Sequence, residues 1–196
     1  MARGGLKKKE LFSDQNSYSK QIENIKKCIA HSDELFIAHY RSKYNQPNPP
    51  AWMVMELVSF NQLSRWYQNL KEKEIKKKIS LHFDSNYIEL ESWIHTTVYL
   101  RNICAHHGRL WNRVLRISPK FPQKELPGQF IKVDGITNGR LYYSLSILLY
   151  FLNAVNPSSS FRKRLLQLLA EYPRVELKIM GFPSHWKEEL LWQMGE

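Results

Sequence analysis

Cysteine and long apolar runs are both scarce in this sequence. Its 196 residues contain 2 cysteines, Cys28 and Cys104, too few for a disulfide framework or a four-ligand zinc site, so we expect reduced thiols in a cytoplasmic protein. No segment approaches the roughly 18 consecutive apolar residues of a membrane span. No apolar stretch follows the basic N-terminal sequence MARGGLKKKE, as it would in a secretion signal. We therefore expect neither secretion nor membrane association.

Acidic residues are outnumbered and unevenly placed. The sequence has 29 Lys and Arg against 18 Asp and Glu, a formal net charge of +11, which favours a phosphate-rich partner. Residues 92–124 contain no Asp or Glu, and their basic residues are Arg101, Arg109, Arg113, Arg116, Lys120 and Lys124. An ordinary solvated surface can carry such a run as well, so the charge alone leaves both interpretations open.

Apolar residues recur at helical spacing along most of the chain. The spacing predicts one helix or a pair over residues 18–40, and helices over residues 51–70, 87–114, 140–155 and 158–172. The lysine-rich residues 71–78 also predict a helix, on which Ile75 and the following Ile79 face inward. Prolines at residues 45–50, and prolines with glycines at residues 118–139, predict loops. The sequence therefore predicts an all-α fold: a flexible basic segment at residues 1–12, then a single helical bundle over residues 13–196 with a long irregular loop near residues 118–139.

Two charged residues fall on apolar stripes of their predicted helices. Glu56 lies between Trp52 and Leu63, and Arg101 lies with Leu90, positions at which a charge needs a partner. One interpretation is a buried structural bridge between Glu56 and Arg101. The other is that Arg101 meets an anion or a second copy of the chain.

Residues 100–113, LRNICAHHGRLWNR, gather three arginines, two asparagines and two histidines. If the helix continues through Gly108, one polar face is formed by His95, Tyr99, Asn102, His106, Arg109 and Arg113. Histidine can take the 2′-hydroxyl proton of RNA or protonate the leaving 5′-oxygen, and arginine can stabilise the charge that grows on the phosphate. The cluster therefore meets the chemical needs of RNA cleavage. Metal ligation is disfavoured because no cluster of Cys or His stands at ligand spacing, and we expect neither a metal nor a cofactor.

The spacing of Arg101 and His106 raises a geometric question. On a straight helix their side chains diverge by about 140°. The two groups could converge if the helix is distorted near Gly108, or if two copies pack antiparallel and share one cleft.

Residues 101–106, RNICAH, have the R-N-x-x-x-H form of the HEPN motif, and RNICAHHGRLWNR at residues 101–113 closely resembles the abortive-infection phage-resistance family (Abi-2, AbiD/AbiF-like). The upstream segment PAWMVMELVSFNQLSRWYQNL and the downstream segment MGFPSHWKEELLW strengthen the resemblance, which covers nearly everything after about Phe36. Members of the family usually carry a further helical region before this part, so we expect the chain to lack that region.

The resemblance implies a HEPN-like α-helical bundle, homodimers in many members, and metal-independent endoribonuclease activity in HEPN relatives that include the type VI CRISPR effector nucleases. By position it implies catalytic roles for Arg101 and His106, with Asn102 at the polar motif position. The extended motif covers His107, Arg109 and Arg113. The other residues that we expect to bind RNA or support the site are Tyr99, His95 and Glu56.

The function predicted in this way is phage defence by a metal-independent endoribonuclease acting through its RNxxxH motif. Its partners would be RNA, a second copy of the chain, and an antitoxin or regulatory RNA. The alternative is a noncatalytic HEPN-type module that binds RNA or a protein and serves as a dimerisation scaffold. A helix-turn-helix repressor is disfavoured, because no short turn between two compact helices is evident.

Overall fold

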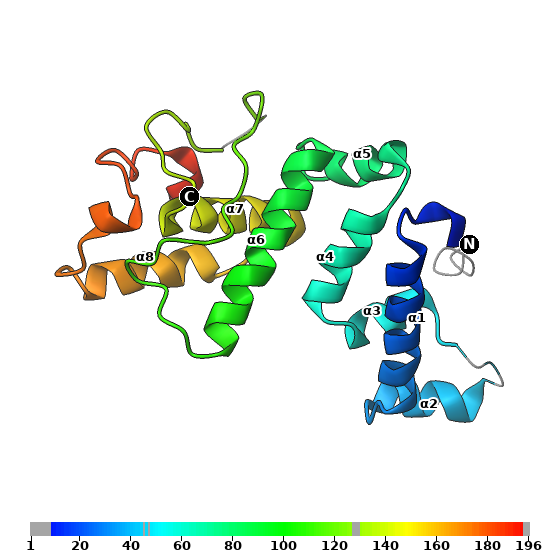
Figure 1. The fold of residues 1–196 in the computed structure, drawn as a ribbon. Coiled ribbons are helices and arrows are strands. Elements are labelled where there is room, and N and C mark those ends of the chain that lie inside the picture. The colour runs from blue at the N-terminus through cyan, green and yellow to red at the C-terminus, as the bar shows by residue number, and fades with distance from the viewer. Residues whose placement is uncertain (1–8, 45, 47, 127–129, 194–196) are drawn as a thin grey trace. The chain divides into compact units, whose positions relative to one another are not determined.

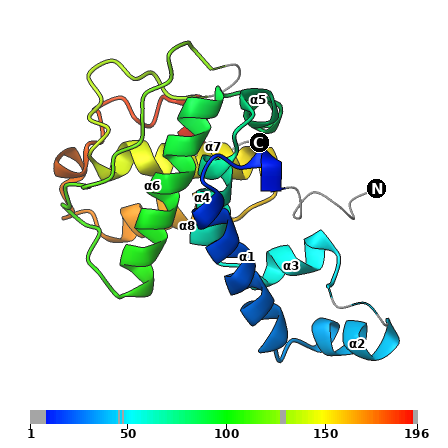
Figure 2. The same cartoon turned by 45° about the vertical axis from the view of Figure 1, so that its right-hand side comes forward.

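The computed structural model describes residues 9–44, 46, 48–126 and 130–193. These residues form eight α-helices and several short 3-10 helices, with no strand (Figures 1 and 2), which confirms the all-α prediction. The chain divides into two compact units, Met1–Lys76 and Lys77–Glu196, and a single domain over residues 13–196 stays a prediction. Within the described ranges, no helix is both long enough and apolar enough to cross a membrane.

The first unit is built around α1 (Gln15–Ala30), which contacts α3 (Ala51–Leu57) and α4 (Phe60–Asn69). The apolar face of α1 supplies Ile25 and Ile29, which pack with Val54 and Trp66. A smaller cluster joins α2 (Leu35–Lys43) to α3. The chain thus breaks between α1 and α2 where the sequence allowed a pair of helices.

The start of the first unit is ordered earlier than residue 13. The 3-10 helix η2 (Lys9–Leu11) precedes Phe12, which is buried and forms an isolated β-bridge with Leu70. The Phe12 ring lies 4.8 Å from the ring of Tyr18, between centroids. Residues 1–8 of the predicted flexible segment lie outside the described residues.

The predicted single helix over residues 51–70 is two helices, α3 and α4. Ser59 starts α4 through a capping box: its Oγ accepts the N–H of Gln62 at 3.3 Å, and Gln62 Oε1 accepts the N–H of Ser59 at 2.9 Å. Such a pair satisfies backbone donors that a new helix leaves free. The periodicity seen in the sequence therefore crosses a helix boundary.

This break corrects the predicted position of Glu56. Because α3 buries Met53 and Val54, Glu56 is exposed and Trp52 is 66% exposed, so neither side chain faces the core of its unit. A similar correction applies to α5 (Lys73–Leu81), in which Ile79 is exposed and the neighbouring Lys76 is buried.

The second unit is built around α7 (Leu141–Val155), which contacts α6 (Tyr87–Ala105) and η4 (Leu190–Trp192). Apolar side chains cover most sides of α7, as is typical of a buried helix. Its Tyr142 and Ile147 pack in one core with Trp93 of α6 and Trp192 of η4. The helix α8 (Phe161–Glu171) and the 3-10 helix η3 (Leu177–Met180) complete the unit.

A long irregular stretch connects α6 to α7 and is fastened to the core. The carbonyl of Lys120 accepts hydrogen bonds from Trp93 Nε1 at 2.8 Å and from Tyr143 Oη at 3.0 Å. The carboxylate of Glu89 accepts the N–H of Gln123 at 2.8 Å. The stretch covers residues 106–140 rather than 118–139, because α6 ends at Ala105 and not near Val114; residues 127–129 lie outside the described part.

Candidate functional site

The end of α6 lies inside the motif RNICAHHG. His106 is the C-cap, and His107 adopts the left-handed conformation with φ 53°. The N–H of His107 donates to the carbonyl of Cys104 at 3.0 Å, and the N–H of Gly108 donates to that of Ile103 at 2.7 Å. This pair of hydrogen bonds defines a Schellman motif, in which glycine usually occupies the left-handed position. Here a histidine occupies it, and the side chains of His106 and His107 are both exposed.

Gly108 is needed for the close approach that follows. A Cβ at this position would lie 2.8 Å from Ile103 Cγ2 and 3.0 Å from the Ile103 carbonyl oxygen, distances that a side chain cannot occupy without a shift of its surroundings. The same point lies 3.4 Å from Nη1 of Arg113. Gly108 is therefore required by the close approach of Ile103, and the guanidinium of Arg113 lies at ordinary contact distance from the same point.

A tight turn holds the arginines that follow. The N–H of Arg113 donates to the carbonyl of Leu110 at 3.1 Å, and Asn112 has φ 52°, which asparagine tolerates better than most residues. Nη1 of Arg113 donates to the carbonyl of Arg109 at 3.2 Å, and Nη1 of Arg140 donates to Asn112 Oδ1 at 3.3 Å. The turn thus gathers three arginines from two parts of the chain.

Arg101 lies on α6 one turn before the helix end and is exposed. Its Nη1 donates to Oδ1 of Asn102 at 3.1 Å. The stripe on which it was predicted begins with the fully buried Leu90 but leaves the core toward the end of the helix, where Arg101 and Ala105 are both exposed. Glu56 and Arg101 are each exposed within their own unit, so neither side chain lies in the core of its unit, as the apolar stripes had suggested. A bridge between the two side chains stays an interpretation.

The predicted six-residue polar face exists only in part. His95, Tyr99 and Asn102 share one side of α6, whereas His106, Arg109 and Arg113 lie beyond the last helical residue. Hydrogen bonds join Arg101 to Asn102 and Arg113 to Arg109. Among the described residues, no hydrogen bond or ion pair is made by the imidazoles of His106 or His107, so both remain available to a ligand.

The electrostatics of this region are one-sided. Arg101, Arg109, Arg116 and Lys120 are exposed, and the acid-free segment around them supplies no carboxylate of its own. The C-terminal end of a helix carries partial negative charge, so an anion near the end of α6 would have to be held by side chains. Within the described ranges, no group of three or more His, Cys, Asp or Glu side chains could hold a metal ion.

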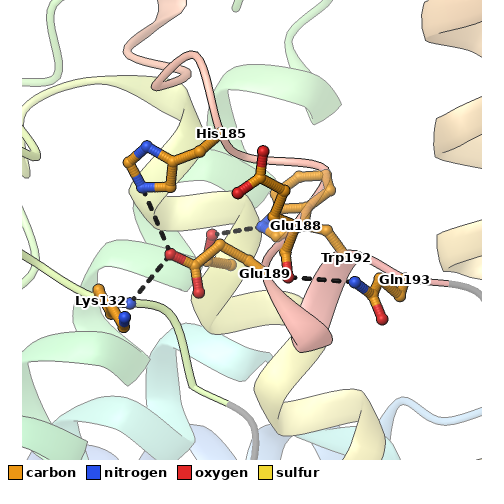
Figure 3. Close-up of polar contacts among 7 residues, drawn as sticks. Lys132, His185, Glu188, Glu189, Trp192 and Gln193 are labelled. Carbon is orange, nitrogen blue, oxygen red and sulfur yellow. Dashed lines mark hydrogen bonds and ion pairs between the residues drawn. The ribbon is translucent and has the colours of Figure 1, made fainter.

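A second histidine-containing arrangement, missed by the sequence reasoning, lies near the C-terminus. Figure 3 shows Glu189 between His185 and Lys132: its Oε1 lies 3.7 Å from His185 Nε2 and accepts the N–H of Lys132 at 3.4 Å. Burial, together with the nearby charge of Glu189, raises the pKa of Tyr142. The sequence signal that could have indicated this contact is the four-residue spacing of His185 and Glu189. Since Glu189 is engaged on both sides, we interpret this arrangement as a fastening of the C-terminal segment.

The comparisons with known proteins concern mainly the first part of the chain. A family model described as Abi-like protein matches residues 4–112. The match therefore includes the end of α6 and stops just before Arg113. The family model also matches residues before Phe36, where no resemblance was expected. It does not reach MGFPSHWKEELLW, where a resemblance was expected. No curated protein and no solved structure matches the chain.

Proposed function

The chain belongs to the Abi-like family, whose model matches residues 4–112 of its 196 residues, and from this membership we propose that the end of α6 is a metal-independent endoribonuclease site. The family suggests a role in abortive infection, a form of phage defence. The observation that supports cleavage is the Schellman ending of α6, which leaves His106 exposed. The flanking arginines, Arg101 and Arg113, hydrogen-bond an amide and a carbonyl oxygen and, among the described residues, no carboxylate.

The proposed reaction uses the 2′-hydroxyl of the RNA as nucleophile. A neutral imidazole of His106 takes the hydroxyl proton while the 2′-oxygen attacks phosphorus, and the bond to the 5′-oxygen breaks as that oxygen is protonated. The products are a 2′,3′-cyclic phosphate and a 5′-hydroxyl. Arg101 stabilises the negative charge on the nonbridging oxygens, with Asn102 holding its guanidinium at 3.1 Å.

Cleavage needs an acid as well as a base, and one imidazole cannot be both in the same step. Two arrangements supply the second group: His107 of the same chain, or His106 of a second copy in a homodimer. A single substitution of His107 tests the first arrangement, because His107 is exposed and directly follows His106.

The test is a cleavage assay in EDTA with labelled RNA. We expect H106A and R101A each to reduce the cleavage rate at least about 100-fold and to leave the circular dichroism spectrum unchanged. The matched control is His39, which is also exposed but belongs to the first unit. H39A should cleave like the wild type. Undiminished cleavage by both purified motif variants would remove the assignment.

A noncatalytic module that binds RNA or a protein is the second candidate. It is favoured by one observation: in the described residues, Arg101 hydrogen-bonds Asn102 and makes no hydrogen bond with His106. This candidate predicts RNA binding that weakens steadily as salt rises, without product formation in any condition.

A further inference from the structure

Trp111 is an exposed aromatic residue for which the proposed cleavage has no use. Four of the six tryptophans are buried, namely Trp66, Trp93, Trp186 and Trp192. Trp111 is 42% exposed and lies in the turn that follows α6. Exposure alone assigns no role to a tryptophan, since Trp52 is also exposed. Trp111 is distinguished by its backbone and by its cationic surroundings.

The ring is held on a fixed backbone. Leu110 on one side packs against the core of the second unit, and Asn112 on the other side accepts a hydrogen bond from Arg140 at 3.3 Å. The backbone hydrogen bond between residues 110 and 113 closes the turn at 3.1 Å. A partner that meets Trp111 therefore pays little conformational entropy to order it.

The surroundings of the ring are cationic. Cζ of Arg109 lies 5.9 Å from the centroid of the Trp111 ring, and Arg113 is tied to the Arg109 carbonyl at 3.2 Å. Residues 92–124 add no acidic side chain. A flat aromatic surface next to guanidinium groups is the combination with which proteins bind unpaired bases, since the ring stacks on the base and the cations neutralise the adjoining phosphates.

We propose that Trp111 and Arg109 form a subsite for one unpaired nucleobase of the RNA strand. The inference rests on the proposed function, since it assumes that the end of α6 handles RNA, and it adds the residue that selects unpaired strands there. A base inside a duplex is already stacked on both faces and cannot lie on Trp111, so the subsite favours single strands or loops over helices.

The test separates base stacking from cleavage by using 2′-O-methylated RNA, which cannot undergo attack by the 2′-hydroxyl. Binding of a labelled single strand and of the same sequence as a duplex is measured with the full chain. We expect W111A to weaken single-strand binding about tenfold and to leave duplex binding unchanged, while W111F retains most of the affinity. Trp52, exposed in the first unit, gives the matched control, and W52A should bind like the wild type.

Fluorescence supplies a readout that a merely structural role would not change. A base stacked on Trp111 quenches its emission, so the quenching caused by single-stranded RNA should be lost in W111F and retained in W52F. Single-strand affinity within twofold of the wild type in W111A, or an equal loss on duplex, overturns the subsite. If W111A loses single-strand binding while unmodified RNA stays uncut by the wild type, the subsite stands and the cleavage proposal alone fails.

Discussion

Two irregular segments of the second unit contain the same residue types in opposite surroundings. Residues 106–116 follow α6, and residues 177–193 form the C-terminal segment; both contain tryptophan, histidine and basic residues. In the C-terminal segment Trp186 and Trp192 are buried, and their rings meet edge to face at 5.4 Å. Trp111 of the first segment lies 42% exposed. Burial of the aromatic side chains thus separates a packing segment from a surface open to a ligand.

The polar groups of the two segments differ in the same way. Near the C-terminus a carboxylate is present: Glu189 lies against His185 and accepts the backbone N–H of Lys132. After α6, Arg113 donates to the carbonyl of Arg109, and Arg140 donates to the side-chain amide oxygen of Asn112. Cations without carboxylate partners keep an attraction for phosphate that paired cations have lost, so histidine and arginine point to function only when their partners are considered.

The sharpest test of this contrast is truncation of one tryptophan in each segment. Trp192 stacks on Tyr142 at 5.3 Å between ring centroids, and its Nε1 donates to Ser146 Oγ at 3.1 Å. We expect W192A to lower the free energy of unfolding by about 3–5 kcal/mol, measured by urea denaturation. W111A should lower it by about 1 kcal/mol or less, since the contact of Trp111 with Arg109 is at the surface. Equal losses in both variants would contradict the division into packing and surface segments.

A smaller effect is expected from a methyl group at the end of α6. In G108A the new Cβ would meet Ile103 Cγ2 at 2.8 Å and the Ile103 carbonyl oxygen at 3.0 Å. We expect a loss of about 1–3 kcal/mol in the free energy of unfolding, measured by urea denaturation, because Ile103 must shift. Gly139 is the matched control because its nearest neighbour, Ser118 Oγ, would be 3.5 Å away; G139A should unfold like the wild type.

The spacing of apolar residues was sufficient to locate the helices that bury one continuous apolar face. It left one helix or a pair open over residues 18–40, and the structure has the pair α1 and α2. The prolines of residues 45–50 predicted a loop, after which α3 begins at Ala51. The spacing failed at residues 51–70, because it continues across Ser59, although the capping pair of Ser59 and Gln62 could have been read from the sequence. It also placed Ile79 inside, where Lys76 is buried instead, since the orientation of a short helix depends on neighbours that a helical wheel does not contain.

The residues of the candidate site stay a prediction, whereas the backbone that carries them differs from the predicted helix over residues 87–114. The motif residues were chosen by chemistry, and their exposure is consistent with that choice. The end of α6 could not be read from the sequence, because a histidine rather than a glycine occupies the left-handed position of the Schellman motif. A continuous helix would spread Arg113 and His106 along one face, whereas the observed turn folds Arg113 back to Gly108.

The smallest expected effect concerns the strain at His107 itself. Its φ of 53° is unfavourable for a residue with a Cβ and is freely adopted by glycine. We expect H107G to raise the free energy of unfolding by about 0.5–1 kcal/mol, measured by urea denaturation. H107A is the control, since it removes the imidazole but keeps the Cβ, and it should give no such gain. If H107A is stabilised as much as H107G, the imidazole and not the backbone is the source of the strain. The left-handed conformation of His107 would then no longer be an example of the backbone strain that is typical of functional sites.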